Sequence, residues 1–159
     1  MTPAPPPPWR RPDPALLRLR RLLVLLLVAL PGAIGSLVLA VPAGGAGVLA
    51  GLAATAACSG LLLLAVERRY AAWGYLERDD DLLVRRGVLV RRTSVVPYGR
   101  MQYVDVTAGP LARRFDLAMV TLHTAAAATD ASIPGLRTDE AARLRDRLAA
   151  LGEARQAGV

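Results

Sequence analysis

The pattern of apolar positions divides the chain into a membrane-like part and a globular part. From Leu22 to Val66 there are 45 consecutive residues without Asp, Glu, Lys, Arg or His. A small soluble domain cannot bury such a run, which is about twice the ~20 residues that one helical span needs. The pattern therefore excludes a soluble globular protein and predicts a hairpin of two transmembrane helices, about Leu22–Val41 and Val48–Val66.

Three features inside the run refine this hairpin. Pro42–Gly47 has the composition of a turn, and Pro31-Gly32 should bend or interrupt the first helix. Small residues recur at every fourth position: Gly32, Ser36 and Ala40 in the first span, and Gly47, Gly51, Thr55 and Ser59 in the second. Such ridges let helix backbones approach closely, which favours packing of the two spans against each other, with dimerisation as the alternative.

Arginines at both ends of the run predict its orientation. Arg10, Arg11, Arg18, Arg20 and Arg21 precede it, Arg68, Arg69 and Arg78 follow it, and the joint carries no charge. The positive-inside rule then places both termini in the cytoplasm of a multi-pass protein of the cell (inner) membrane. Tyr70, Trp73 and Tyr75 come next and suit the headgroup layer. A cleaved secretory signal ending near Val41–Ala43 is the weaker alternative, because the apolar run is too long and a second span follows it.

The rest of the chain predicts an α+β domain at residues 73–152, between a disordered Pro-rich tail at residues 1–15 and a short tail at residues 153–159; residues 16–72 contain the hairpin. Six β-like runs are separated by turn residues: Tyr75–Arg78, Leu82–Arg86, Val88–Val96, Met101–Thr107, Leu117–Thr124 and Ala131–Ile133. This spacing is typical of a compact antiparallel sheet or barrel, with a short helix at Leu111–Phe115.

A C-terminal helix is predicted from Thr138, a good N-cap, to about Gly152. Ala141, Leu144, Leu148 and Leu151 form one apolar stripe on it. Because a lone amphipathic helix must bury its apolar face, we expect this stripe to cap the sheet. Arg143, Arg145 and Arg147 should then lie on the outer surface of the helix.

Composition limits the chemistry that this domain can perform. The chain has 20 Arg, no Lys and 13 acids, for a net charge of +7, and it holds one Cys (Cys58) and one His (His123). Cys–His and His-based triads therefore lack partners, His123 reads as an ordinary half-exposed or hydrogen-bonded residue, and Asp79–Asp81 reads as a solvated turn. The few aromatic residues are scattered and form no stacking platform for nucleic acid. We expect no enzyme activity, metal, cofactor, nucleic-acid partner or small-molecule substrate.

Arginines around a predicted hairpin are the candidate binding groups. Arg85, Arg86, Arg91 and Arg92 flank Gly87, and Arg100 and Arg113 lie in later breaks. Neighbouring residues on a strand face opposite ways, so each pair can offer at most one Arg to a shared face. Such groups are attracted to an anionic leaflet by about 1 kcal/mol each. We favour this general attraction over a defined headgroup pocket.

An ordered set of motifs resembles a known family. The set comprises Val96-Pro97-Tyr98-Gly99-Arg100-Met101-Gln102-Tyr103-Val104-Asp105-Val106, then Gly109–Ala118, Leu122–Ala125 and Ile133–Leu136, with Leu82–Arg92 before them. Together these motifs resemble the bacterial pleckstrin-homology-like (PH-like) membrane proteins of the YdbS/YdbT type, over about Leu22–Leu151. The resemblance implies a barrel-like antiparallel sheet capped by the C-terminal helix, and no settled catalytic activity. In two places the chain departs from the family: Asp116 stands where Gly is usual, and Ala125–Ala128 replaces a Gly-rich turn.

The family signature on this chain consists of Pro97, Arg100, Gln102, Asp105, Gly109, Pro110 and Leu111. We interpret it as structural, with Arg100 and Asp105 bonding turns and pairing across the end of the sheet; partner binding is the alternative. The sequence thus predicts a non-enzymatic integral membrane protein that presents a cytoplasmic PH-like domain for interaction or assembly. Its expected partners are the lipid bilayer and another membrane protein or a second copy. The alternative function is recognition of anionic lipid headgroups by the Arg-rich hairpin.

Overall fold

The computed structural model of the chain describes residues 9–38, 40–125 and 130–157. These residues form two compact units. Residues 17–68 make a helical unit, and the residues before and after them make a second, PH-like unit. The Pro-rich residues 1–8 and most of the turn expected at Ala125–Ala128 lie outside the described residues.

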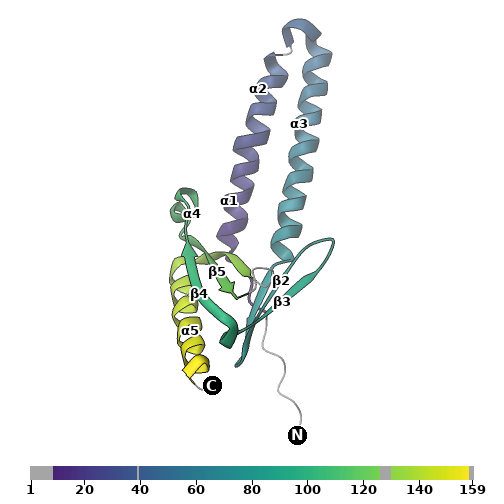
Figure 1. Ribbon diagram of the computed structural model, residues 1–159. Coiled ribbons are helices and arrows are strands. Elements are labelled where there is room, and N and C mark those ends of the chain that lie inside the picture. The colour runs from purple at the N-terminus through teal and green to yellow at the C-terminus, as the bar shows by residue number, and fades with distance from the viewer. Residues whose placement is uncertain (1–8, 39, 126–129, 158–159) are drawn as a thin grey trace. The chain divides into compact units, whose positions relative to one another are not determined.

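The helical unit confirms the two apolar helices. The first comprises α1 (Pro14–Val24), a π-helical turn (Leu25–Ala29) and α2 (Leu30–Val38), and the second is α3 (Ala40–Ala71) (Figure 1). Residues Pro14–Val38 and Gly44–Ala71 are each long and apolar enough to cross a membrane. At the end that is flanked by arginines, each helix is several residues longer than the predicted span.

Pro31 interrupts the first helix as predicted. The N–H of Leu30 donates to the carbonyl of Leu25, five residues back, instead of the usual four. Pro31 has no N–H, and its ring crowds the carbonyl four residues before it. The helix therefore contains one wider, π-helical turn just before the proline.

The joint between the helices is shorter than predicted. Gly44 has φ 62° and ψ −167°, which L residues rarely adopt, whereas Gly45–Gly47 already belong to the second helix. One left-handed residue is enough to break the helical path, so the later glycines can join the helix. The prediction of a turn through Gly47 is therefore wrong.

The two helices touch through the predicted small residues. A Cβ added at Gly32 would lie 2.5 Å from Thr55 Cγ2, and one added at Gly51 would lie 2.7 Å from Ser36 Oγ. The Ser36 hydroxyl donates to the carbonyl of Gly32 at 2.7 Å, which removes a polar group from the contact. Packing between the spans, predicted from this spacing, is confirmed.

The PH-like unit contains two antiparallel three-stranded sheets. The first has the order β1 (Gly74–Glu77), β2 (Asp81–Arg86), β3 (Arg92–Pro97), and the second β4 (Met101–Thr107), β5 (Leu117–Thr124), β6 (Ala131–Arg137). A 3-10 turn at Tyr98–Arg100 joins them, and α4 (Pro110–Arg114) links β4 to β5. Among the described residues the sheets share one core without closing into a barrel. The predicted α+β architecture is confirmed as two sheets.

Two strands differ from the prediction at glycines. The run expected at Val88–Val96 begins only at Arg92, because the chain turns at Gly87 with φ 105°. Conversely, β6 continues through Pro134-Gly135. There Gly135 has φ 69° and the register against β5 shifts, so the pair forms a bulge that accommodates a proline without an N–H.

The last element, α5 (Thr138–Ala157), buries the predicted stripe. Ala141, Leu144 and Leu148 are fully buried in the shared core, and Leu151 is partly buried against it. The helix does not end at Gly152: that residue is buried close to the carbonyl of Tyr98, and helix continues where a tail was expected. A residue without a side chain lets α5 pass close to the 3-10 turn.

The segment before the first span belongs to the PH-like unit. Arg10 and Tyr75 exchange two backbone hydrogen bonds of 2.9 Å, which extends the edge of β1. The N–H of Asp13 donates to Gly135 O at 2.7 Å, and Leu16 is buried. The prediction of a disordered tail therefore fails for residues 9–15, because β1 offers an edge on which this segment pairs.

Asp116 explains one departure from the family pattern. Its φ is 55°, a left-handed conformation that glycine adopts without strain and that Asp tolerates better than most residues. Its carboxylate pairs with Arg137 at 2.8 Å, and its carbonyl accepts from the N–H of Thr138. The backbone at this position requires a residue that tolerates the left-handed conformation, and Asp does so.

Candidate functional site

The β2–β3 hairpin places the predicted arginines around an apolar tip. Its loop holds Val88, Leu89 and Val90, whose side chains are 41%, 98% and 67% exposed. Gly87 turns the chain so tightly that a Cβ there would lie 2.0 Å from the carbonyl oxygen of Val90. The loop geometry thus requires glycine and leaves three hydrophobic side chains in the open.

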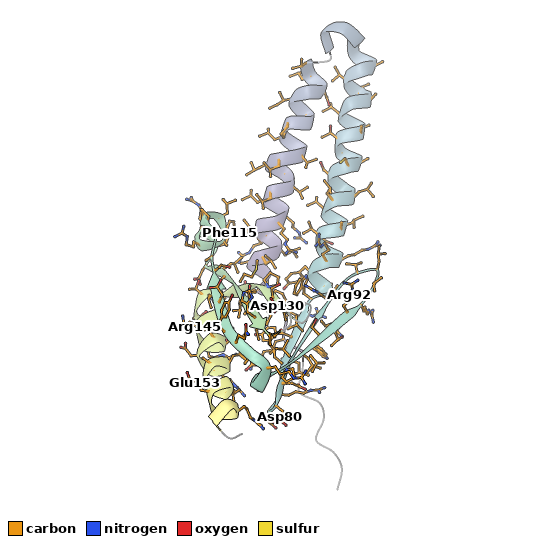
Figure 2. The ribbon with its side chains drawn as sticks, viewed as in Figure 1. Asp80, Arg92, Phe115, Asp130, Arg145 and Glu153 are labelled. Atoms are coloured by element: carbon orange, nitrogen blue, oxygen red, sulfur yellow. The ribbon has the colours of Figure 1, made fainter. Side chains whose placement is uncertain are left out.

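Strand alternation separates the arginines as predicted. Arg86 and Arg92 are direct partners in the β2–β3 register, so their side chains share one face. Arg85 turns to the other face, where its guanidinium carbon lies 4.6 Å from the ring centroid of Trp9, a cation–π contact. Arg91 is exposed in the loop, and Figure 2 shows Arg92 on the hairpin.

A groove of about 540 Å³ joins this hairpin to the segment after the second span. It is lined by Arg69, Trp73, Arg86, Gly87, Val88, Leu89, Val90 and Arg92. No acidic side chain lines it, and among the described residues Arg69, Arg86 and Arg92 form no ion pair. Three cations therefore converge on one groove without internal neutralisation.

The remaining candidate arginines lie elsewhere. Arg100 is exposed in the 3-10 turn, and Arg113 is exposed on α4. Within the described chain Arg100 forms no ion pair with Asp105, which is also exposed, so the expected pairing across the sheet end does not occur.

The other signature residues divide between backbone and surface positions. Pro97 ends β3 opposite Asp81, and Gly109-Pro110 begins α4, where the Gly109 carbonyl accepts from the N–H of Arg113 at 2.9 Å. A proline suits the first turn of a helix because its missing N–H has no partner there. Leu111 and Gln102 are exposed, and Gln102 lies at a register shift of β4.

A second groove lies between β4 and α5. It has a volume of about 330 Å³ and is lined by Met101, Gln102, Tyr103, Val104, Arg145, Leu148, Ala149, Gly152 and Glu153. Arg145 and Glu153 project from α5 (Figure 2), and Leu148 lies between them in sequence. β4 is an edge of its sheet, paired on one side with β5.

A network of charged side chains fastens α5 to β1, and the sequence did not reveal it. Glu77 has a side chain only 7% exposed; its carboxylate lies 2.8 Å from Arg143, 3.4 Å from Arg147 and 3.5 Å from Arg10. Arg143 is partly buried by these contacts, contrary to its expected outer position, whereas Arg147 remains exposed, as expected, while it pairs with Glu77. Arg145 does lie outward and pairs with its neighbour Asp146 at 2.7 Å.

Glu140 and Tyr75 extend this network. The Tyr75 hydroxyl donates to Glu140 at 3.1 Å, and Tyr75 is buried in the core, so its expected place in the headgroup layer is wrong. The pKa of Glu140 is lowered to about 2. The main cause is its hydrogen bonding with Arg143, the hydrogen bond from Tyr75 contributes less, and partial burial opposes the shift. Burial and the nearby Glu140 raise the pKa of Tyr75 to about 12. The arrangement is a structural ion-pair cluster.

His123 is a hydrogen-bonded, partly exposed residue, as predicted. Its Nδ1 lies 3.1 Å from Asp130 Oδ2, and its ring stacks on Tyr103 with centroids 4.4 Å apart. The pKa of the Asp130 carboxyl is lowered, mainly by the hydrogen bond from the backbone N–H of Thr124 and to a smaller extent by its bond with His123. Within the described ranges, no group of three or more His, Cys, Asp or Glu side chains is placed to hold a metal ion.

Two apolar helices and a two-sheet domain with a C-terminal helix define a membrane protein with a PH-like domain. The bacterial PH domain family matches residues 21–152, spans included, and the chain belongs to that family. It is similar to the UPF0699 transmembrane protein YdbS of Bacillus subtilis (strain 168), with 39% identity over 83 residues, 52% of this chain and 51% of that protein. The match thus spans about half the length of this curated relative. No solved structure matches the chain significantly.

Proposed function

We propose that this membrane protein is not an enzyme and that it presents its PH-like domain in the cytoplasm. There the groove between β4 and α5 binds an extended segment of another membrane protein. The observation that carries this proposal is the β4 edge beside that groove.

The groove suits an added strand. On an edge strand, alternate backbone groups point away from the neighbouring strand and can pair with an extended peptide, while pockets beside the edge select its side chains. The floor of the groove is apolar, with Val104 and Leu148, and its rim carries one cation and one anion, Arg145 and Glu153. The fitting partner is a segment with alternating apolar side chains and low net charge.

The N-terminal pairing supports presentation on one side of the membrane. Arg10 precedes the first apolar helix and Tyr75 follows the second, yet they share a β-bridge. Both flanks must therefore lie on the same side of any bilayer that the two helices cross. The excess of arginine in these flanks favours the cytoplasmic side.

The non-enzymatic part of the proposal rests on how the reactive groups are used. His123 bonds Asp130 and stacks on Tyr103, and Cys58 lies in the helical unit. Nucleophilic catalysis needs a base that is free to take a proton, whereas the His123 ring is engaged by Asp130 and Tyr103. The strongest pKa shifts belong to Glu140, Arg143 and Tyr75, which join β1 to α5 in an ion-pair cluster.

The orientation can be tested with single cysteines in a Cys58→Ala background. Gly45→Cys should react with a membrane-impermeant maleimide on intact cells, whereas Glu153→Cys should react only after lysis. A Cβ at residue 45 meets nothing within 4 Å, and residue 153 is exposed, so both changes leave the packing intact. The opposite labelling pattern would contradict cytoplasmic presentation.

The partner site can be tested by photo-crosslinking in cells. Tyr103, 58% exposed at the groove, is replaced by p-benzoylphenylalanine, and adducts are identified by mass spectrometry. We expect one adduct with another membrane protein, lost in Ala149→Arg, which fills the groove, and retained in Ala150→Arg. Ala150 is the matched control because it is exposed on the same helix outside the groove. An adduct made of two copies of this chain, or one insensitive to Ala149→Arg, contradicts the proposal.

A further inference from the structure

We infer that the β2–β3 hairpin is a second membrane contact: its tip, Val88–Val90, inserts into the bilayer interface, and Arg69, Arg86 and Arg92 bind phospholipid phosphates. This site uses none of the residues of the β4–α5 groove, so it stands independently of the proposed protein partner.

The first observation is the chemistry of the tip. Hairpin turns in water are usually built from Asn, Asp and Gly, whereas this loop exposes two valines and a leucine in a row. Moving such side chains from water into an apolar environment is favourable. Among the described residues of the hairpin, the apolar tip is followed at once by Arg91 and Arg92 and preceded by Arg85 and Arg86. An apolar end with a cationic collar matches the layers of a lipid leaflet.

The second observation is the unneutralised cluster beside the tip. Arg86 and Arg92 lie directly opposite each other in the β ladder. Two like charges in this position destabilise the strand pair unless an anion bridges them. Arg69 lines the same groove, and no carboxylate does. Guanidinium groups bind phosphate oxygens through two parallel hydrogen bonds, so three of them suit a phosphate.

The third observation is the position of Arg69. It follows Val66, the last residue of the apolar run, by three residues, which in a helix is roughly 5 Å. Arg69 therefore lies at the depth of the headgroups wherever this helix leaves the hydrocarbon. Leu89 lines the same groove as Arg69, so a phospholipid held by Arg69 also meets the tip. Trp73, also in the groove, has the amphipathic ring that this layer favours.

These three observations favour a bilayer over other occupants. A soluble anion would use the arginines and leave the tip in water. A protein partner would need its own anionic and apolar surface at the depth of the headgroups, where phospholipids already supply both. Covalent linkage to the apolar helix keeps the lipid surface always within reach.

The test uses the full-length protein in nanodiscs. Leu89→Cys in a Cys58→Ala background is labelled with the environment-sensitive fluorophore NBD, and Glu153→Cys is the matched control; both side chains are exposed. In discs of phosphatidylcholine and phosphatidylglycerol with nitroxide lipids labelled high on the acyl chain, we expect at least about twofold quenching at residue 89 and almost none at residue 153. Equal quenching at both positions overturns the insertion.

The phosphate contacts are tested in the same discs. Arg86→Gln combined with Arg92→Gln should abolish most of the quenching at residue 89. Replacement of phosphatidylglycerol by phosphatidylcholine should do the same, because the choline ammonium of phosphatidylcholine neutralises its phosphate and leaves the three arginines without a net negative charge to bind. Arg100→Gln, which removes an exposed arginine outside the groove, should leave it unchanged. Quenching at residue 89 that persists without Arg86 and Arg92 overturns the assignment of the phosphate site, and loss of quenching in Arg100→Gln shows that only total charge matters, which also overturns it.

Discussion

Leu144→Ala is expected to lower the free energy of unfolding of the PH-like domain by about 2–5 kcal/mol. Leu144 is fully buried in the core that the two sheets share with α5. Truncation removes apolar contacts and leaves a cavity between α5 and the sheets. Alanine is the better helix former, so the loss cannot come from the helix itself.

The measurement is chemical denaturation of the protein in nanodiscs, followed by the fluorescence of Trp9 and Trp73, which both belong to the PH-like unit. Arg145→Ala is the matched control, because Arg145 is exposed on the same helix and, in the part of the chain that the structure describes, its ion-pair partner is the exposed neighbour Asp146. Exposed pairs contribute about 0–1 kcal/mol. If Leu144→Ala and Arg145→Ala cost the same, α5 does not cap the core.

Acid should destabilise the same domain through Glu140. Its pKa is lowered from 4.5 to about 2 by hydrogen bonds from Arg143 and Tyr75. A carboxyl with a depressed pKa in the folded state contributes stability above its unfolded pKa and loses it as the pH falls through the folded value. The loss should therefore fall between about pH 4.5 and pH 2. The side chain is 29% exposed, so after solvent screening we expect about 1–2 kcal/mol.

The free energy of unfolding measured at pH 5, 4, 3 and 2 checks this prediction. The informative quantity is the difference in free energy of unfolding between the protein and Glu140→Gln, because it isolates the contribution of this one carboxyl. That difference should shrink as the pH falls. Glu153→Gln, an exposed carboxylate later on the same helix, serves as control and should not change the slope. A difference that is constant with pH contradicts the role assigned to Glu140.

Local patterns predicted the elements of this fold well. The length of the uncharged run predicted two helices, the spacing of Gly32, Ser36, Gly51 and Thr55 predicted their contact, and the stripe of α5 predicted its buried face. These properties depend on periodicity within one segment, and periodicity is what a sequence displays directly.

Properties that depend on several segments were not predictable. Glu77 and Arg143 are 66 residues apart, and Arg10 comes from before the spans, so nothing local signals their cluster. The tip at Val88–Val90 was mistaken for strand because β-branched residues favour strands, and only the backbone of Gly87 shows that the chain turns there. The exposed tip is thus a place where propensity and structure disagree, as is common at binding surfaces.

The bridge between Arg10 and Tyr75 has a consequence for how the protein is made. The segment that completes the edge of β1 leaves the ribosome before either apolar helix, and the strand that it joins emerges after both. The edge of β1 can therefore be completed only after both apolar helices have been synthesised. α5, which fills the core, is synthesised after all six strands of the two sheets, so the core is completed only then.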